Sequence, residues 1–206
     1  ACPVFIDHVP KILDLRRQLV MEEGRVPETM RAAMRSLETR DHPFAGATAT
    51  RLDWCKDLGV KIAADSGPTE YLYWVGCATA LNPRNQKVAQ AFAGLMQQAG
   101  IDFSILGNEE ACTGDAARRM GNEYLFQSMA RRNIEVLQSR QVKKIVTTCP
   151  HCLNSFKNEY PQFGGQFEVI HHSQLLSDLI DQGRLKPAVD RKSTRLNSSH
   201  VSESRM

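Results

Sequence analysis

Apolar residues in the first forty positions recur with the period of an α-helix. Those with this spacing are Ile12, Leu15, Leu19, Met30, Met34 and Leu37. They form two sets, each on one helical face, so the pattern predicts two helices within residues 8–40. Gly24 separates the sets, because glycine commonly ends a helix.

Residues 41–70 lack such a period and contain several turn-forming residues. Asp41-His42-Pro43, Gly46 and Ser66-Gly67-Pro68 are the clearest of these breakers. The segment is therefore predicted to be a loop-like linker of low apolar density.

From residue 71 onward, short apolar runs alternate with longer helical patterns. The predicted strands are 71–75, 103–106, 144–148 and 167–170. The predicted helices are 85–99, 116–139, 151–159 and 173–182. Strands that alternate with helices of this length imply right-handed crossovers and a parallel sheet. We therefore expect an α/β fold, preceded by a helical connector.

Composition agrees with a packed domain. The 206 residues are 42% hydrophobic and 24% charged, which suits one domain of ordinary size or slightly more. No apolar run approaches the roughly 20 residues that span a bilayer. The chain opens with Ala1-Cys2-Pro3, without an initiator Met or a signal peptide, so we expect it to begin inside a longer protein.

The net charge of +3 resides at the carboxyl end. Residues 191–206 carry four basic side chains and one acidic side chain, and the other residues carry equal numbers of each. The charge therefore gives no argument for nucleic-acid binding. Residues 192–206 also include five serines. The segment 187–206 is predicted to be disordered, and its sequence resembles a translated library adapter, so we assign it no function.

Four of the six cysteines follow predicted strands. Cys77 follows the first strand, Cys112 lies in the loop after the second, and Cys149 and Cys152 follow the third. The carboxyl ends of parallel strands share one edge of the sheet, and ligands bind there. We therefore expect these four thiols to converge. Cys55 has no partner at ligand spacing and is interpreted as an ordinary buried thiol.

Four thiols at one edge have several possible uses. They suit an iron–sulfur cluster or a four-thiolate zinc site. Zinc ribbons usually have two Cys-x-x-Cys pairs, whereas this chain has one such pair and two lone cysteines, which favours a cluster. His171 and His172 follow the fourth strand and point towards the same edge. They are either ligands or proton relays or, more simply, caps of the next helix or plain surface residues.

Cys149-Pro150-His151-Cys152 offers a different chemistry. A Cys-x-x-Cys at the start of a helix is typical of thiol-disulfide oxidoreductases, because the helix terminus and the histidine stabilise a thiolate. The thioredoxin fold also needs a proline before a later strand. Pro161 is the only nearby candidate, and a Phe-Gly-Gly stretch separates it from that strand.

Three longer strings resemble the cysteine-rich (CCG) domain family. They are residues 74–77, 108–126 and 147–152, and the resemblance extends over residues 1 to about 186. The family includes the cysteine-rich subunit of heterodisulfide reductase and the iron–sulfur subunit of glycolate oxidase. The resemblance is strongest to membrane-bound oxidoreductases that pass electrons from electron-transfer flavoprotein to quinone.

This copy departs from the family pattern at one motif. Ala111 stands where the first cysteine of Cys-Cys-Gly would be, and Thr113 separates Cys112 from Gly114. The resemblance therefore implies that Cys77, Cys112, Cys149 and Cys152 hold an ordinary [4Fe–4S] cluster for electron transfer. The departure makes thiol-disulfide chemistry of the heterodisulfide reductase kind less expected.

The resemblance also implies missing parts. Cys2-Pro3 resembles the end of a ferredoxin-type motif, so Cys2 would ligate a second cluster in the intact protein. A second CCG motif would follow downstream. The expected organisation is 1–40, the end of a ferredoxin-like module with a helical connector, then the 41–70 linker and the cysteine-rich domain at 71–186.

The implied function is that of an iron–sulfur oxidoreductase component. The expected donor is a flavoprotein, and the expected acceptor is a quinone or a membrane haem domain, on the cytoplasmic face of the plasma membrane. A heterodisulfide reductase or glycolate oxidase type of iron–sulfur protein is the alternative. No residue is placed as a general base or nucleophile, so the fragment alone is not expected to turn over substrate.

Overall fold

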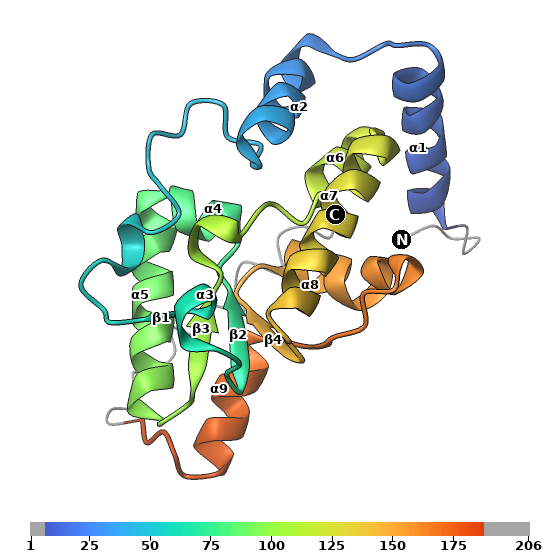
Figure 1. Cartoon of the computed structure of the whole chain (residues 1–206). Helices are drawn as coiled ribbons and strands as arrows, with labels where there is room; N and C mark the ends of the chain where they lie inside the picture. Colours follow the sequence, from blue (N-terminus) through green and yellow to red (C-terminus); the bar gives the residue numbers. More distant parts are fainter. Residues whose placement is uncertain (1–6, 188–206) are drawn as a thin grey trace, which may run out of the picture.

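A five-stranded, all-parallel sheet forms the centre of the protein (Figure 1). The structure is a computed structural model that describes residues 7–187. The strands are β1 (Lys61–Ile62), β2 (Tyr71–Trp74), β3 (Phe103–Ile105), β4 (Lys144–Thr147) and β5 (Glu168–His171). Their order is β1-β3-β2-β4-β5. The predicted α/β fold with a parallel sheet is confirmed.

The first strand lies inside the segment that was predicted to be a loop. β1 pairs with β3, with Lys61 opposite Ser104 and Ile62 opposite Ile105. The short helix α3 (Ala63–Ser66) follows directly, and a 3₁₀ turn covers Asp53–Cys55. The prediction of continuous loop over 41–70 was therefore wrong. A strand of two residues is too short to show a period, and its conformation comes from tertiary pairing.

Helices cover both faces of the sheet. On one face, Leu72, Trp74 and Ile145 pack with residues of α7 (Glu123–Ser139). On the other face, Tyr73 and Val146 pack with residues of two more helices, α5 (Pro83–Gln98) and α9 (His172–Asp181). The alternation along each strand divides its side chains between two cores, as expected for a parallel sheet that is buried on both sides.

The remaining α-helices lie at the carboxyl edge of the sheet or beyond it. They are α1 (His8–Arg17), α2 (Glu28–Arg40), α4 (Cys77–Leu81), α6 (Asp115–Met120) and α8 (Pro150–Asn154). A π-helical turn, Gln18–Glu22, extends α1, and another, Ser155–Glu159, extends α8. The two helices predicted within residues 8–40 are confirmed. Within residues 7–187, no helix is long and apolar enough to cross a membrane.

A single long helix was predicted over 116–139, and this prediction was wrong. Gly121 (φ +95°) ends α6, and α7 begins two residues later. A Cβ atom on Gly121 would lie 2.5 Å from the backbone oxygen of Arg16. The break therefore lets α1 approach α6 backbone to backbone, which a longer side chain would prevent.

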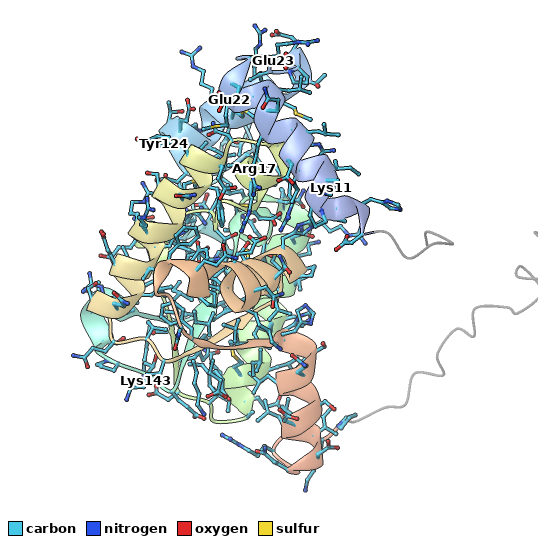
Figure 2. All side chains as sticks on the ribbon, turned by 90° about the vertical axis from the view of Figure 1, so that its right-hand side faces the viewer. Lys11, Arg17, Glu22, Glu23, Tyr124 and Lys143 are labelled. Atoms are coloured by element: carbon cyan, nitrogen blue, oxygen red, sulfur yellow. The ribbon has the colours of Figure 1, made fainter. Side chains whose placement is uncertain are left out.

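Polar contacts hold α1 against the body of the protein. Arg17 Nη2 contacts the Glu123 carboxylate at 2.8 Å, and Arg17 points from α1 towards the helices behind it (Figure 2). Leu13 is the one buried residue of α1, whereas Ile12 and Leu15 are exposed. The apolar side chains from which this helix was predicted are thus mostly exposed, as far as the described residues show.

Candidate metal centre

The four predicted ligands lie at the carboxyl ends of three neighbouring strands. Cys77 begins α4 after β2, Cys112 lies in the loop after β3, and Cys149 caps α8 after β4 with Cys152 one turn later. Gly76 brings these loops together. A Cβ atom there would lie 3.5 Å from the Cys152 sulfur and 3.6 Å from the Cys149 Cβ. The end of β2 therefore packs directly against the Cys-x-x-Cys turn.

The four thiols are free, so none of them forms a disulfide. They interact in two pairs. Hydrogen bonding with Cys112, together with burial, raises the pKa of Cys77 well above its usual value. The same bond lowers the pKa of Cys112, because it stabilises the thiolate that accepts it. In the second pair, hydrogen bonding with Cys152 lowers the pKa of Cys149 to about 6. The same bond and burial raise the pKa of Cys152.

The charges of the two pairs also influence one another. Negative charge on Cys77 and on Cys112 further raises the pKa of Cys152. The four sulfurs therefore share one electrostatic environment, and the structure brings together all four residues that the sequence predicted. Among residues 7–187, no three His, Cys, Asp or Glu side chains are grouped closely enough to bind a single metal ion.

A buried polar network fixes the Cys112 loop. Asn133 Nδ2 donates to the backbone oxygen of Cys112 at 2.9 Å and to the Tyr160 hydroxyl at 3.0 Å. The Tyr160 hydroxyl in turn donates to the backbone oxygen of Thr113 at 3.0 Å. Gly114 (φ +84°) then caps the start of α6, and a Cβ atom there would lie 3.0 Å from the Phe126 ring. Helix α7 and the segment after α8 thus position this loop.

An ion pair that sequence reasoning missed lies beside the cysteines. The Glu110 carboxylate accepts hydrogen bonds from the backbone nitrogens of Val75 (2.9 Å) and Gly76 (2.8 Å), just before Cys77. Arg51 Nη1 donates to the same carboxylate at 3.0 Å. Burial holds the pKa of Glu110 above its usual value, although Arg51 and the two backbone donors oppose this effect. No local pattern relates residues 51 and 110, so no sequence signal indicates this contact.

Among the described residues, His171 at the end of β5 and His172 at the start of α9 are not grouped with the cysteines as ligands of one metal ion. His171 and Gln174 form a capping box at the start of α9, in which the backbone nitrogen of His171 donates to the Gln174 side-chain oxygen at 3.0 Å. His172 stacks edge-on against Phe92. Capping of the next helix, one of the interpretations of this pair, is confirmed for His171.

The other two cysteines, Cys55 and Cys2, are not among the four converging thiols. Cys55 is half-buried, and its thiol donates to the Leu52 backbone oxygen at 3.4 Å, so it is an ordinary thiol that is less buried than predicted. Cys2 lies outside the described residues, as does nearly all of the predicted disordered tail at 187–206.

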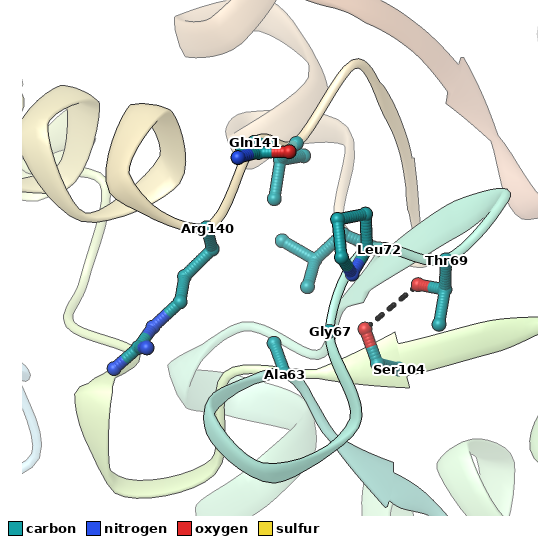
Figure 3. A pocket seen from close by; sticks show the side chains of 9 residues that line it. Ala63, Gly67, Thr69, Leu72, Ser104, Arg140 and Gln141 are labelled. Carbon is teal, nitrogen blue, oxygen red and sulfur yellow. Dashed lines mark hydrogen bonds between the residues drawn. The ribbon is translucent and has the colours of Figure 1, made fainter.

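His151 is an exposed residue of the Cys-x-x-Cys turn. Its Nδ1 atom lies 2.9 Å from the buried Asp115 carboxylate. Asp115 also accepts a hydrogen bond from Arg119 at 3.0 Å. A shallow hollow lies here between α6 and α8. The pocket of Figure 3 is a different feature, at the amino-terminal edge of the sheet, where the Thr69 and Ser104 hydroxyls are 2.8 Å apart and no cysteine is present.

A parallel α/β sheet with cysteines at its carboxyl edge defines a class of domain. Residues 71–157 match the family described as "CCG: Cysteine-rich domain". The chain therefore carries a cysteine-rich domain of the CCG family, as its motifs indicated. The match includes all four converging cysteines and leaves out Arg51.

The curated relatives extend this similarity to nearly the whole chain. EtfAB:quinone oxidoreductase of Syntrophomonas wolfei is 41% identical over 91% of this chain and 27% of its own length. Probable iron-sulfur-binding oxidoreductase FadF of Bacillus subtilis is 44% identical over 90% of this chain and 27% of its own length. This chain thus spans about a quarter of either relative.

Similarity at lower identity reaches another group of oxidoreductases. One component of the dihydromethanophenazine:CoB–CoM heterodisulfide reductase of Methanosarcina barkeri is 31% identical over 90% of this chain and 45% of its own length. No solved structure matches the chain. The named relatives are thus oxidoreductases or components of oxidoreductases.

Proposed function

We propose that Cys77, Cys112, Cys149 and Cys152 hold one [4Fe–4S] cluster and that the domain relays electrons within a quinone-linked oxidoreductase. The observation that carries this proposal is the convergence of four free, largely buried thiols from three strand ends. Four thiolates are the usual ligand set of such a cluster. When bound, the cluster supplies one-electron storage and transfer.

The residues around the thiols fit this group. Thiolates are the ligand form, and Cys149 already favours it, with a pKa lowered to about 6. Trp74, Phe126 and Phe156 belong to the same core cluster as Cys112 and Cys152, and they would exclude water from the site. The indole nitrogen of Trp74 is buried without a hydrogen-bond partner among the described residues. This N–H group is thus a buried donor that has no acceptor among the described residues.

A zinc-stabilised, non-redox module is the first competing function. A structural zinc ion needs four ligands at about 2.0–2.3 Å around one point. The four thiols comprise one Cys-x-x-Cys pair and two lone cysteines, whereas zinc ribbons usually have two such pairs. The relatives' names speak of iron–sulfur and oxidoreductase proteins.

Thiol-disulfide exchange at Cys149 and Cys152 is the second competing function. The lowered pKa of Cys149 at the start of α8 favours it, because an attacking thiol reacts as the thiolate. The neighbouring Cys77 and Cys112 thiols oppose it. An oxidoreductase of this kind needs two reactive sulfurs, and here four sulfurs share one site.

The wider assembly is proposed from the relatives. We infer an electron-transfer flavoprotein as donor, from the EtfAB relative, and a quinone or a membrane haem domain as acceptor. The intact protein would work at the cytoplasmic face of the plasma membrane and hold a second, ferredoxin-type cluster through Cys2. A heterodisulfide reductase or glycolate oxidase type of complex is the alternative assembly.

Metal analysis of the chain tests the proposal. The protein is purified without oxygen, and iron, acid-labile sulfide and zinc are measured with a visible spectrum. We expect about four irons and four sulfides per chain, with absorbance that bleaches on reduction. Cys77→Ser should lose most of the iron, whereas the matched control Cys55→Ser should retain it. About one zinc per chain without iron would overturn the proposal.

A chain without either metal is then reconstituted with ferrous iron and sulfide under reducing conditions. Uptake of four irons that depends on Cys77 supports the relay. Failure to take up iron, together with a reversible Cys149–Cys152 disulfide detected by mass spectrometry, would establish the thiol function in its place.

A further inference from the structure

Arg51 makes contact with the loops of two proposed ligands at once. Its Nη1 atom donates to Glu110, which holds the two backbone nitrogens that precede Cys77. Its Nη2 atom donates to the backbone oxygen of Asp41 at 3.2 Å. That same oxygen accepts the backbone N–H of Cys112 at 2.8 Å. One guanidinium group therefore connects the Cys77 loop with the Cys112 loop through a single intermediary on each side.

The pair is enclosed by protein. The side chains of Arg51 and Glu110 are 10% and 3% exposed. Buried opposite charges interact far more strongly than exposed ones, because little water screens them. Glu110 accepts hydrogen bonds from Arg51 and from the backbone nitrogens of Val75 and Gly76. The pair therefore places a guanidinium group and a carboxyl group beside the loops that carry the thiols.

These two groups contact the loops that carry Cys77 and Cys112. A positive charge beside the site favours added negative charge there, and a negative charge opposes it. Uptake of one electron by a cluster at this site would add one negative charge without forming or breaking a bond. The same two side chains would therefore influence electron uptake.

We propose that Arg51 and Glu110 position the Cys77 and Cys112 loops and set the reduction potential of the cluster that these loops would hold. The proposal rests on the proposed function. It assigns a role to Arg51, which lies outside the matched region 71–157. Arg51 belongs to the segment 41–70, which was predicted only to be a linker. The electron comes from the flavoprotein donor, and in the experiment from dithionite.

Two substitutions of opposite sign test the electrostatic part. Arg51→Met removes the positive charge, so the midpoint potential should become more negative than that of the wild type. Glu110→Gln removes the negative charge and leaves Arg51 positive, so the potential should become more positive. The double variant removes both charges and should lie between the two single variants. A purely structural role predicts no such reversal of sign.

Arg132→Met is a matched control. Arg132 also pairs with Asp41, through its carboxylate, but both side chains are substantially exposed. Solvent and salt screen such a pair, so this variant should keep the wild-type potential. Potentials are measured by anaerobic dye-mediated titration, followed by electron paramagnetic resonance of the reduced state. Iron content and thermal unfolding are recorded for every variant.

Arg51→Lys tests the positioning part. Lysine keeps the charge and loses the planar fork that reaches Glu110 and Asp41 together. We expect lower iron occupancy than in the wild type, with a potential closer to the wild-type value than that of Arg51→Met. Should Arg51→Met fail to fold, the direction in which Glu110→Gln shifts the potential from the wild-type value still decides the sign of the effect.

The outcomes separate the two proposals. A wild-type chain that cannot take up iron overturns the proposed function, and this inference falls with it. Loaded variants whose potentials equal the wild-type value overturn this inference alone. Potentials that move in the same direction for Arg51→Met and Glu110→Gln also overturn it, because charge cannot produce that result.

Discussion

The hydroxyl of Thr113 donates a hydrogen bond to the sulfur of Cys152, with 3.8 Å between Oγ1 and Sγ. Thr113 is 1% exposed, and it occupies the position that separates Cys112 from the glycine of the family motif. A hydrogen bond to a ligand sulfur stabilises negative charge there, and such bonds are among the determinants of cluster potential. The departure from Cys-Cys-Gly thus introduces a donor that contacts a proposed ligand.

Thr113→Val keeps the shape of this side chain and removes the hydroxyl. We expect the reduction potential of the loaded chain to become more negative, because the reduced site loses a donor. Thr113→Ser keeps the hydroxyl and should stay close to the wild type. Dye-mediated redox titration measures the shift. Equal potentials for the valine and serine variants would contradict a role of the hydroxyl.

The cluster-free chain should show one unusually reactive thiol. The pKa of Cys149 is lowered to about 6 by hydrogen bonding with Cys152, with further help from backbone donors and His151. Because only the thiolate reacts, alkylation of Cys149 by iodoacetamide should rise through pH 6 and level off above about pH 7. Burial raises the pKa of Cys55, so its rate should still be rising at about pH 9.

Tandem mass spectrometry of digested, alkylated protein resolves Cys149 from Cys152 within their shared peptide. The reduced, metal-free chain is used, and its circular dichroism is compared with that of the loaded chain as a control for folding. A Cys149 rate that climbs in parallel with that of Cys55 up to about pH 9 would show that its thiolate is not stabilised.

Gly121→Ala should destabilise the protein more than Gly164→Ala. Both glycines have positive φ, at +95° and +82°, but only at Gly121 would a Cβ atom meet backbone, at 2.5 Å from the Arg16 oxygen. Backbone strain alone costs about 1–2 kcal/mol. The clash at Gly121 should add about 1–3 kcal/mol. Urea unfolding measures both values, and equal losses would place the cost in backbone strain alone.

The network around Asn133 should be sensitive to its central member. Tyr160→Phe removes the hydroxyl that accepts from Asn133 and donates to the Thr113 oxygen, and should cost about 1–2 kcal/mol of unfolding free energy. Asn133→Leu leaves the Cys112 oxygen and the Tyr160 hydroxyl without their donor, so we expect a larger loss, of about 2–4 kcal/mol. Denaturant unfolding of the cluster-free chain compares the two. A smaller loss for Asn133→Leu would exclude it as the centre of the network.

Much of the sheet could be predicted because the relevant patterns are local. The run at 71–75 and the glycine after it are contiguous in sequence, and cysteines placed after strands must share an edge in a parallel sheet. The convergence of Cys77, Cys112, Cys149 and Cys152 follows from this rule alone. Their assignment to a cluster needed the resemblance in addition, because spacing left zinc open.

The parts that could not be predicted depend on distant contacts. β1 is a strand because it pairs with β3, and the break at Gly121 serves the approach of Arg16. The ion pair between Arg51 and Glu110 joins residues that are 59 positions apart. Each of these features depends on a partner that no window of local sequence contains.

The parallel sheet also dictates the order in which the site can form. No two of its strands are joined by a tight hairpin, because every neighbouring pair is parallel. Its contacts therefore join distant parts of the chain, and such topologies fold slowly. Cys149 and Cys152 meet Cys77 only when β4 has added to β2. Before that step a nascent chain carries separated thiols, so binding of one group by all four sulfurs is coupled to pairing of the central strands.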